Sequence, residues 1–268
     1  MVQTKRKQLY LAIAVLSLLL AVLLCILLIP KRRPQAEATP TETTQPILET
    51  TPLNPQEFTY INGFLTCVSA ESQLGIDVSS HQGEIDWEQV KAAGVEFVML
   101  RVGYRGLDQG GLYEDEYAQI NYAGAKAAGL KVGAYFFSQA ITPEEALKEA
   151  EFALVITKGW SLDMPLVYDW EYSGAENRVA AMTAPQVTEC AQLFCETVKK
   201  AGFTPMVYFN PDIGRNFLHL EALKDYPFWL AMYDQDFTYD YKVDMWQYTC
   251  EGSVPGIVGN VDINLYFP

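Results

Sequence analysis

The sequence predicts an α/β fold, an irregular eight-stranded (β/α) barrel that resembles a TIM barrel. From residue 73 onward, strand-like and helix-like segments alternate, which is typical of a parallel sheet covered by helices. Eight strand-like segments occur, enough to close the sheet into a barrel. The last three are too closely spaced for regular helices, so we expect helices to be missing there and the final strand to run antiparallel.

Eight short apolar segments carry the strand pattern. They are LGIDVS (74–79), FVMLRVGY (97–104), KVGAYFFS (131–138), PLVYDWEY (165–172), TPMVYFN (204–210), FWLAMY (228–233), DMWQYT (244–249) and VDINLYF (261–267). Only eleven residues separate Thr249 from Val261, too few for a comfortable parallel crossover. This spacing is the reason for expecting a reversed last strand.

The helices between the first five strands have explicit start and stop signals. Capping-box spacing occurs at Asp86 with Gln89, Thr142 with Glu145, and Thr183 with Gln186. The expected helix ends are Gly94, Gly129 and Gly202, and a strand follows each of them at once.

The N-terminus has the composition of a membrane segment. A short basic stretch, residues 1–8, precedes residues 9–29, which are 21 residues without a charge, and about 20 suffice to cross a bilayer. We expect a signal anchor. The alternatives are a signal peptide cleaved near Ala36-Glu37-Ala38 and, behind it, a buried core helix. The basic clusters on the two sides nearly balance, so they do not set the orientation.

Residues 30–72 are expected to be a linker and lead-in to a domain at 73–268. Residues 34–58 are rich in Thr, Pro and Glu and have little to bury. In the following stretch, Tyr60, Ile61, Phe64 and Leu65 are candidates for packing onto the domain. This organisation would hold a folded domain away from the membrane.

The part of the chain after residue 33 is strongly acidic. It contains 13 basic and 33 acidic residues, a net charge of −20. Nucleic-acid binding needs a basic patch, so we exclude nucleic acid as a partner. Anionic lipid head groups would also repel this surface.

Four cysteines lie outside the apolar segment: Cys67, Cys190, Cys195 and Cys250. They are either buried free thiols or members of disulfides, for which three connectivities are possible. The chain has no CxxC pair and two histidines, so we expect no structural zinc site and no metal or other cofactor.

Four acids are expected at one end of the barrel. Asp169 and Glu171 are two residues apart on a strand and therefore face the same side, with Cα atoms roughly 7 Å apart. Asp77 ends the first strand, and Asp262 begins a reversed last strand, which brings it to the same end. Mutual repulsion would raise the pKa of one acid, so that it can donate a proton near neutrality while another stays ionised.

Several motifs together resemble glycoside hydrolase family 25, the Chalaropsis-type lysozymes. They are GIDVSSHQGEIDW (75–87), VYDWE (167–171), VYFN (207–210), WLAMY (229–233) and MWQYTCEGSVPGIVGNVDIN (245–264). The resemblance extends over residues 75–267. It implies an irregular barrel with a reversed last strand. It also implies N-acetylmuramidase activity without a cofactor, the hydrolysis of the β-1,4 bond between N-acetylmuramic acid and N-acetylglucosamine in peptidoglycan.

By this resemblance, Glu171 matches the general acid and Asp169 the carboxylate that stabilises the reaction centre, while Asp77 and Asp262 match the other two acids. Many members have a histidine after the tyrosine of the third strand, where this chain has Phe136 and Phe137. Glycoside hydrolysis needs one protonated carboxylic acid and one negative group near the cationic centre. The separation of the two carboxylates is not fixed by the sequence, so retention and inversion both stay open.

Four aromatic residues are candidates for substrate binding by stacking on sugar rings, although aromatics on barrel strands also serve as core: Tyr135, Tyr208, Trp246 and Tyr248. Two functions are compatible with the sequence. The first is an active muramidase that is monomeric and acts on peptidoglycan glycan strands. It would be held by a single-pass anchor at the cell membrane with its domain outside, or secreted after cleavage. The second is a catalytically weak module that binds cell-wall glycan. The four acids favour the first.

Overall fold

The computed structural model describes residues 57–233 and 241–268. The expected anchor at 9–29 and most of the linker lie outside these residues. Within the described ranges, no helix is long and apolar enough to cross a membrane.

The described chain alternates strands and helices in the predicted order. The strands are β1 (Phe58–Ile61), β2 (Phe64–Cys67), β3 (Gln73–Val78), β4 (Phe97–Arg105), β5 (Leu112–Glu114), β6 (Lys131–Ser138), β7 (Leu166–Trp170), β8 (Pro205–Phe209), β9 (Phe228–Ala231), β10 (Met245–Gly252) and β11 (Val261–Tyr266). The helices are α2 (Trp87–Ala92), α3 (Ala118–Ala127), α4 (Pro143–Ile156), α5 (Ala184–Lys200) and α6 (Pro211–Asn216), with short 3-10 turns at Ser80–Gln82 and Leu220–Leu223.

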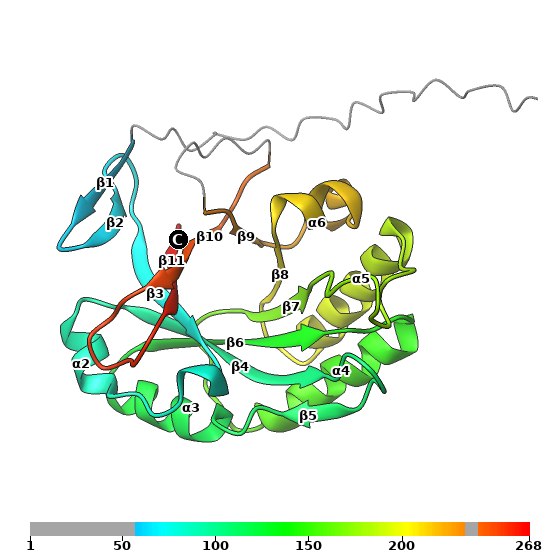
Figure 1. Ribbon diagram of the computed structural model, residues 1–268, viewed down its shortest axis with the longest axis horizontal. Coiled ribbons are helices and arrows are strands. Elements are labelled where there is room, and N and C mark those ends of the chain that lie inside the picture. Colours follow the sequence, from blue (N-terminus) through cyan, green and yellow to red (C-terminus); the bar gives the residue numbers. More distant parts are fainter. Residues whose placement is uncertain (1–56, 234–240) are drawn as a thin grey trace, which may run out of the picture. The chain divides into compact units, whose positions relative to one another are not determined.

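Eight strands close into a barrel in the order β3, β11, β10, β9, β8, β7, β6, β4, because β3 pairs with both β11 and β4. β11 is antiparallel to β10 and to β3, whereas β9 and β10 are parallel. The predicted barrel with a reversed final strand is therefore confirmed. Helices α2 to α5 cover the part of the barrel built from the earlier strands (Figure 1).

Side chains alternate along the strands between an outer layer beneath the helices and the barrel interior. At the closed end of the barrel, the Phe97 ring of β4 lies against the backbone of Gly75 on β3. A side chain does not fit there, since a Cβ added at Gly75 would lie 2.2 Å from this ring. The interior cluster consists of Phe97, Met99, Met164, Val167, Met206, Tyr208, Trp229, Ala231 and Met245. This packing fills the barrel below the mouth, so ligands can enter only from the mouth.

The predicted helix signals are present. Thr142 Oγ1 accepts a hydrogen bond from the Glu145 amide at 3.3 Å, which satisfies a free N–H at the start of α4. Gly129 and Gly202, with φ of 75° and 93°, adopt the left-handed conformation after α3 and α5. Each helix end is thus set locally. The four cysteines outside the apolar segment are free thiols, buried except for Cys250.

Two elements were not predicted. β5 pairs antiparallel with the end of β4, outside the barrel. β1 and β2 form a hairpin that packs on the barrel ahead of residue 73. The Phe58 ring lies 5.1 Å from Trp246 and 6.4 Å from Phe267, and the Leu65 amide donates to the Tyr248 hydroxyl at 3.3 Å.

Only part of the lead-in packs as expected. Leu65 is buried and Phe64 packs against the core, whereas Tyr60 and Ile61 are exposed. The folded unit therefore includes the hairpin.

Replacing Phe58 by alanine should lower the free energy of unfolding by about 1–3 kcal/mol, because a half-buried aromatic contact is lost. The matched control is Tyr60→Ala on the same strand, where the side chain is 58% exposed. It should change the stability by less than about 0.5 kcal/mol. Urea unfolding followed by tryptophan fluorescence measures both variants. Equal losses would show that the hairpin does not stabilise the barrel.

Candidate active site

The open mouth of the barrel contains a cavity of about 190 Å³. All eight barrel strands, or the residues just after them, contribute to its wall. The lining residues are Asp77, Arg101, Tyr135, Phe137, Asp169, Glu171, Tyr208, Trp229, Tyr233, Gln247 and Asp262. The four predicted acids are therefore brought together.

The alternation of β7 explains the Asp-x-Glu pair. Tyr168 and Trp170 pack in the outer layer beneath the helices, whereas Val167 belongs to the interior cluster. Asp169 shares the orientation of Val167, and Glu171 follows two residues later at the strand's end. Both carboxyl groups consequently line the cavity.

The reversed last strand brings the other two acids together. Asp77 on β3 and Asp262 on β11 are directly opposite in the antiparallel register. Directly opposed residues lie on the same face of the sheet, with Cβ atoms about 4.5–5.5 Å apart. A parallel last strand would have put Asp262 at the closed end of the barrel.

Side-chain amides hold Asp77 in place. Gln247 Nε2 and Asn264 Nδ2 both donate to Asp77 Oδ2 at 2.8 Å. Gln247 Oε1 in turn accepts from the Tyr233 hydroxyl at 2.8 Å, and Asn264 Oδ1 accepts from Trp229 Nε1 at 2.8 Å. Every amide in this network has its orientation fixed by a second partner, so Asp77 is rigidly placed.

Arg101 on β4 supplies a cationic group to the wall. Its Nε is 2.8 Å from Asp115 Oδ2, and its Nη2 donates to Ser80 Oγ at 3.1 Å. The guanidinium lowers the pKa of Asp169, although burial outweighs this effect. Its position thus favours the ionised form of Asp169, but less strongly than burial opposes that form.

Burial raises the pKa of every acid in the cavity. It raises those of Asp77 and Asp169 well above their ordinary range, and the neighbouring carboxylates raise them further. Burial also raises the pKa of Glu171, against the effect of the Tyr208 hydroxyl. For Asp262, burial and the charge of Glu171 raise the pKa to about 6. All four shifts favour the protonated form, so the carboxyl groups of the cavity bind protons more tightly than exposed acids do.

Asp169 has a free acceptor. Its Oδ1 is buried and has no hydrogen-bond partner among the described residues. Buried polar atoms are nearly always satisfied, so a ligand with an N–H or O–H donor would complete this site. No group of three or more His, Cys, Asp or Glu side chains in residues 57–233 and 241–268 is placed to hold a metal ion.

Of the four predicted aromatic contacts, Tyr135 and Tyr208 line the cavity, but Trp246 and Tyr248 do not. Both of the latter are buried in the outer layer. Trp246 Nε1 donates to the Met232 carbonyl at 2.7 Å, and the hairpin covers Tyr248. These two residues therefore lie outside the cavity that holds the acids, because on β10 it is Gln247 between them that faces inward.

Several lining residues were not predicted: Arg101, Phe137, Trp229, Tyr233 and Gln247. Arg101 could have been identified from the sequence, because it is the single charged residue within an otherwise apolar strand segment, FVMLRVGY (97–104). Phe137 is one of the two residues at which the chain departs from the family pattern. Its neighbour Phe136 is buried in the outer layer, so Phe137 alone reaches the cavity.

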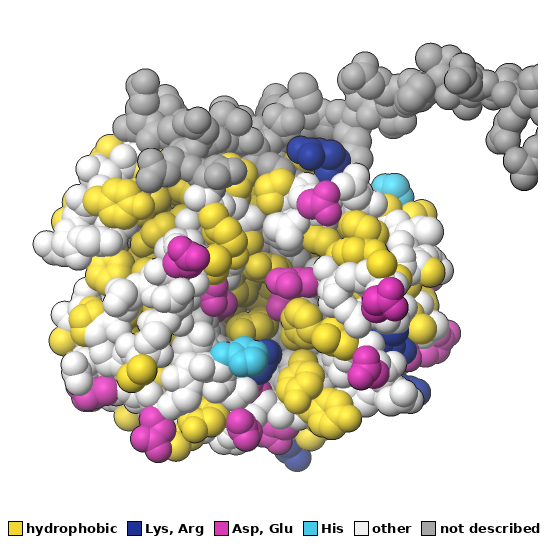
Figure 2. Space-filling view, viewed as in Figure 1, with side chains coloured by type: hydrophobic (Ala, Val, Ile, Leu, Met, Phe, Trp, Pro, Cys, Tyr) yellow, Lys and Arg dark blue, Asp and Glu magenta, His cyan; other side chains and the backbone are white. Residues whose placement is uncertain are grey.

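A second cavity, of about 590 Å³, adjoins the first, since Arg101 and Phe137 line both. Its wall also includes His81, Tyr104 and Leu107. In Figure 2, acidic side chains border a hollow near the middle of the face shown, and a histidine lies beside a basic side chain at its edge. The mouth therefore continues beyond the first cavity into a second, larger one.

Comparison with known proteins agrees with this geometry. The chain belongs to glycosyl hydrolases family 25, whose family model matches residues 76–257. An autolytic lysozyme of Clostridium acetobutylicum is 31% identical over 191 residues, which is 71% of this chain and 54% of that protein. The chain thus spans about half the length of this curated relative.

Solved structures show the same fold. The modular autolysin LytC from Streptococcus pneumoniae, solved in complex with a synthetic peptidoglycan ligand, has a TM-score of 0.66 at 25% identity over 78% of this chain and 52% of that chain. A bacterial lysozyme from Streptomyces coelicolor has a TM-score of 0.60 at 26% identity over 73% of this chain and 92% of that chain.

The raised pKa of Asp262 predicts a pH-dependent stability. The folded protein binds this proton more tightly than the unfolded chain, whose pKa is the ordinary 3.8. The free energy of unfolding should therefore fall as the pH rises from about 4 to about 6. Asp262→Asn should flatten this slope in urea unfolding across that range, whereas the exposed Asp225→Asn should leave it unchanged. An unchanged slope in Asp262→Asn would contradict the burial argument.

Proposed function

We propose that this protein is a peptidoglycan muramidase that hydrolyses the β-1,4 bond between N-acetylmuramic acid and N-acetylglucosamine. The observation that carries the proposal is the convergence of four carboxyl groups, two buried and two partly buried, in the barrel mouth of a family 25 chain. The lysozymes to which the chain is similar support the same activity.

Glu171 is the proposed general acid. It follows the end of β7, and burial raises its pKa, which favours the protonated form that a general acid needs. The proton passes to the glycosidic oxygen as the bond to the leaving sugar breaks, and Glu171 is left ionised. Asp77 and Asp262 lie across the cavity, and the charge that Glu171 acquires on losing its proton raises the pKa of both.

Asp169 is the proposed stabilising carboxylate. Its unpartnered Oδ1 can accept a hydrogen bond from the 2-acetamido N–H of the sugar. This contact would orient the acetamido oxygen toward the anomeric carbon, and the negative charge would stabilise the cationic centre. Arg101 keeps Asp169 more easily ionised than it would otherwise be.

The aromatic wall is the proposed sugar path. Tyr135, Tyr208 and Trp229 form one side of the cavity, and Tyr233 stands half exposed at its rim. The adjoining cavity, with Tyr104 and Phe137, continues this path for neighbouring sugars. Tyrosine and tryptophan rings combine an apolar face with a polar O–H or N–H group, and a sugar ring likewise has apolar and polar surfaces.

Glu171→Gln should reduce the rate of glycan cleavage by about 10²–10⁴-fold, since the amide keeps the shape but cannot donate the proton. The measurement is the release of new reducing ends from purified peptidoglycan, with sedimentation to measure wall binding. Binding should persist. The control, Glu176→Gln, changes an exposed acid on the same segment and should keep full activity.

Near-normal turnover by Glu171→Gln would overturn the assignment of the acid. Binding without cleavage by the unaltered protein would instead favour a glycan-binding module.

Asp169→Asn should also cause a large loss of rate, but with a different pH profile. Removing the Asp169 charge lowers the pKa of Glu171, because an ionised neighbour no longer opposes its ionisation. The protonated, active form of Glu171 is then lost at lower pH. The alkaline limb of kcat against pH should therefore move to lower pH, and an unchanged limb would argue against coupling of the two acids.

We also propose that residues 9–29 anchor the protein in the cell membrane with the domain outside. The support is the uncharged segment, the solvated linker and an extracellular substrate. Protease added to intact, wall-stripped cells should remove the domain. If the domain is protected until the membrane is opened, it lies inside the cell and the proposed topology is wrong. If the domain is released into the medium without protease, the segment is a cleaved signal peptide.

A further inference from the structure

We propose that Gln139, which does not line the catalytic cavity, is a positioning residue for Glu171. This inference rests on the proposed role of Glu171 as general acid. Gln139 follows β6 and is fully buried. It contacts the main chain of Glu171 rather than its carboxyl group, so its effect would be indirect.

The side chain of Gln139 bridges two strand ends. Its Nε2 donates to the Ser138 carbonyl and to the Glu171 carbonyl, each at 2.9 Å. Its Oε1 accepts from Ser173 Oγ at 2.7 Å. Both N–H donors and the oxygen are thus satisfied, and the segment after β7 is held on both sides of Tyr172.

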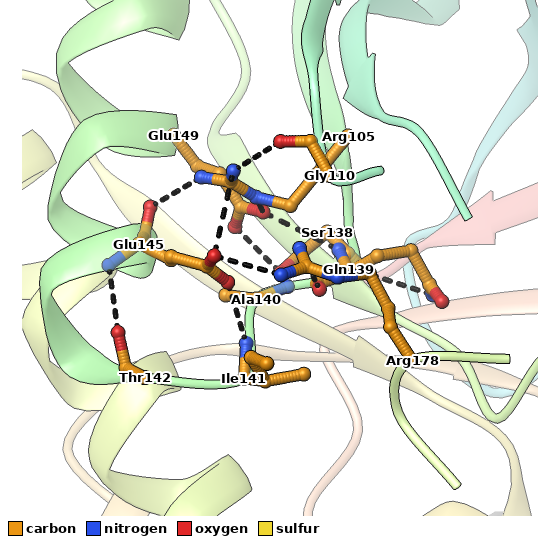
Figure 3. A network of polar contacts seen from close by, with 10 residues as sticks. All are labelled: Arg105, Gly110, Ser138, Gln139, Ala140, Ile141, Thr142, Glu145, Glu149 and Arg178. Atoms are coloured by element: carbon orange, nitrogen blue, oxygen red, sulfur yellow. Dashed lines mark hydrogen bonds and ion pairs between the residues drawn. The ribbon is translucent and has the colours of Figure 1, made fainter. Parts of the chain in front are cut away.

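Gln139 is itself held by its main chain (Figure 3). Its amide donates to Glu149 Oε1 at 3.3 Å, and its carbonyl accepts from Arg178 Nη1 at 3.0 Å. Arg178 Nη2 is 2.7 Å from Glu145 Oε1. Both glutamates lie on α4, so this helix fixes the position of Gln139.

The base of this network is a buried ion pair. Glu149 is fully buried; its Oε1 lies 2.6 Å from Arg105 Nε, and its Oε2 accepts from Ser138 Oγ at 2.6 Å. Arg105 also donates to the carbonyls of Gly110 and Glu145. Buried polar networks of this kind add little net stability, but when fully satisfied they define one geometry.

The geometry matters because Glu171 is placed differently from Asp77. Two side-chain amides bind the carboxyl group of Asp77 directly. Glu171 is held through its main chain by Gln139, and its longer side chain then extends into the cavity. A displacement of about 1 Å in a catalytic group can cost about 10²-fold in rate.

The test is Gln139→Met, which keeps the length of the side chain but removes its hydrogen bonds. In the full-length chain, kcat on peptidoglycan should fall by about 10–100-fold while wall binding stays within about twofold. The alkaline limb of kcat should also move to lower pH, because a loosened Glu171 is better hydrated and loses its proton more readily. The other titratable groups that face Glu171 across the cavity are Asp77, Arg101, Tyr135, Asp169, Tyr208, Tyr233 and Asp262.

Ser173→Ala removes the other side of the same bridge and acts on a less buried residue. It should shift kcat and the pH limb in the same direction by a smaller factor. The double variant should cost less than the product of the two single losses, because both act on one contact. Ser173→Ala therefore tests the inference even if Gln139→Met fails to fold.

The matched control is Thr188→Val, which removes a buried hydroxyl on α5 that bonds the Ala184 carbonyl and the His219 amide. It should lower stability without moving the pH limb. A wild-type kcat and pH limb in Gln139→Met and in Ser173→Ala would overturn the inference. If Glu171→Gln is inactive at the same time, the proposed function stands and only the positioning role fails.

Discussion

Carboxyl groups that are shielded from water and close to one another cannot all be ionised, and the mouth of this barrel holds four of them. Burial raises the pKa of each, and ionised neighbours raise those of Asp77, Asp169 and Asp262 further. A protein could relieve this by hydrating the acids or by placing a cation next to each. Among the described residues, Arg101 is the one arginine that lines the cavity. Asp77 and Asp169 are buried, and Glu171 and Asp262 are partly buried. The raised pKa values favour the protonated form that the proposed acid catalysis needs.

The rest of the fold maintains this arrangement. Closure of the barrel excludes water from below, because aromatic and methionine side chains fill the interior. The reversed β11 places Asp262 opposite Asp77, and the hydrogen-bonded amides of Gln247 and Asn264 prevent Asp77 from moving away. Behind β7, the network from α4 to Gln139 holds the segment that carries Glu171. Repulsion between the acids is thus resisted by hydrogen bonds in the cavity wall and behind β7.

Much of this could be predicted from the sequence, for physical reasons. The strand period of two put Asp169 and Glu171 on one face, and the short connection before Val261 required a reversed strand, which brought Asp262 to the mouth. The orientation of β10 could not be predicted. An apolar strand with aromatic residues on one face does not reveal which face is inside, and the unpredicted hairpin buries Trp246 and Tyr248 on the outer side.

Gln139 could not be found for a different reason. Its partners come from α4 and from the segment after β7, and only the folded chain brings these together.

The most direct test of this account is the titration of the cavity acids themselves, by NMR of protein labelled with ¹³C at the Asp and Glu carboxyl groups. The account predicts at least one carboxyl group in the cavity that titrates near neutral pH, and the loss or shift of that titration in Glu171→Gln. If all carboxyl groups titrate within about one unit of their ordinary values near 4, the cavity holds no retained proton, and the account is contradicted.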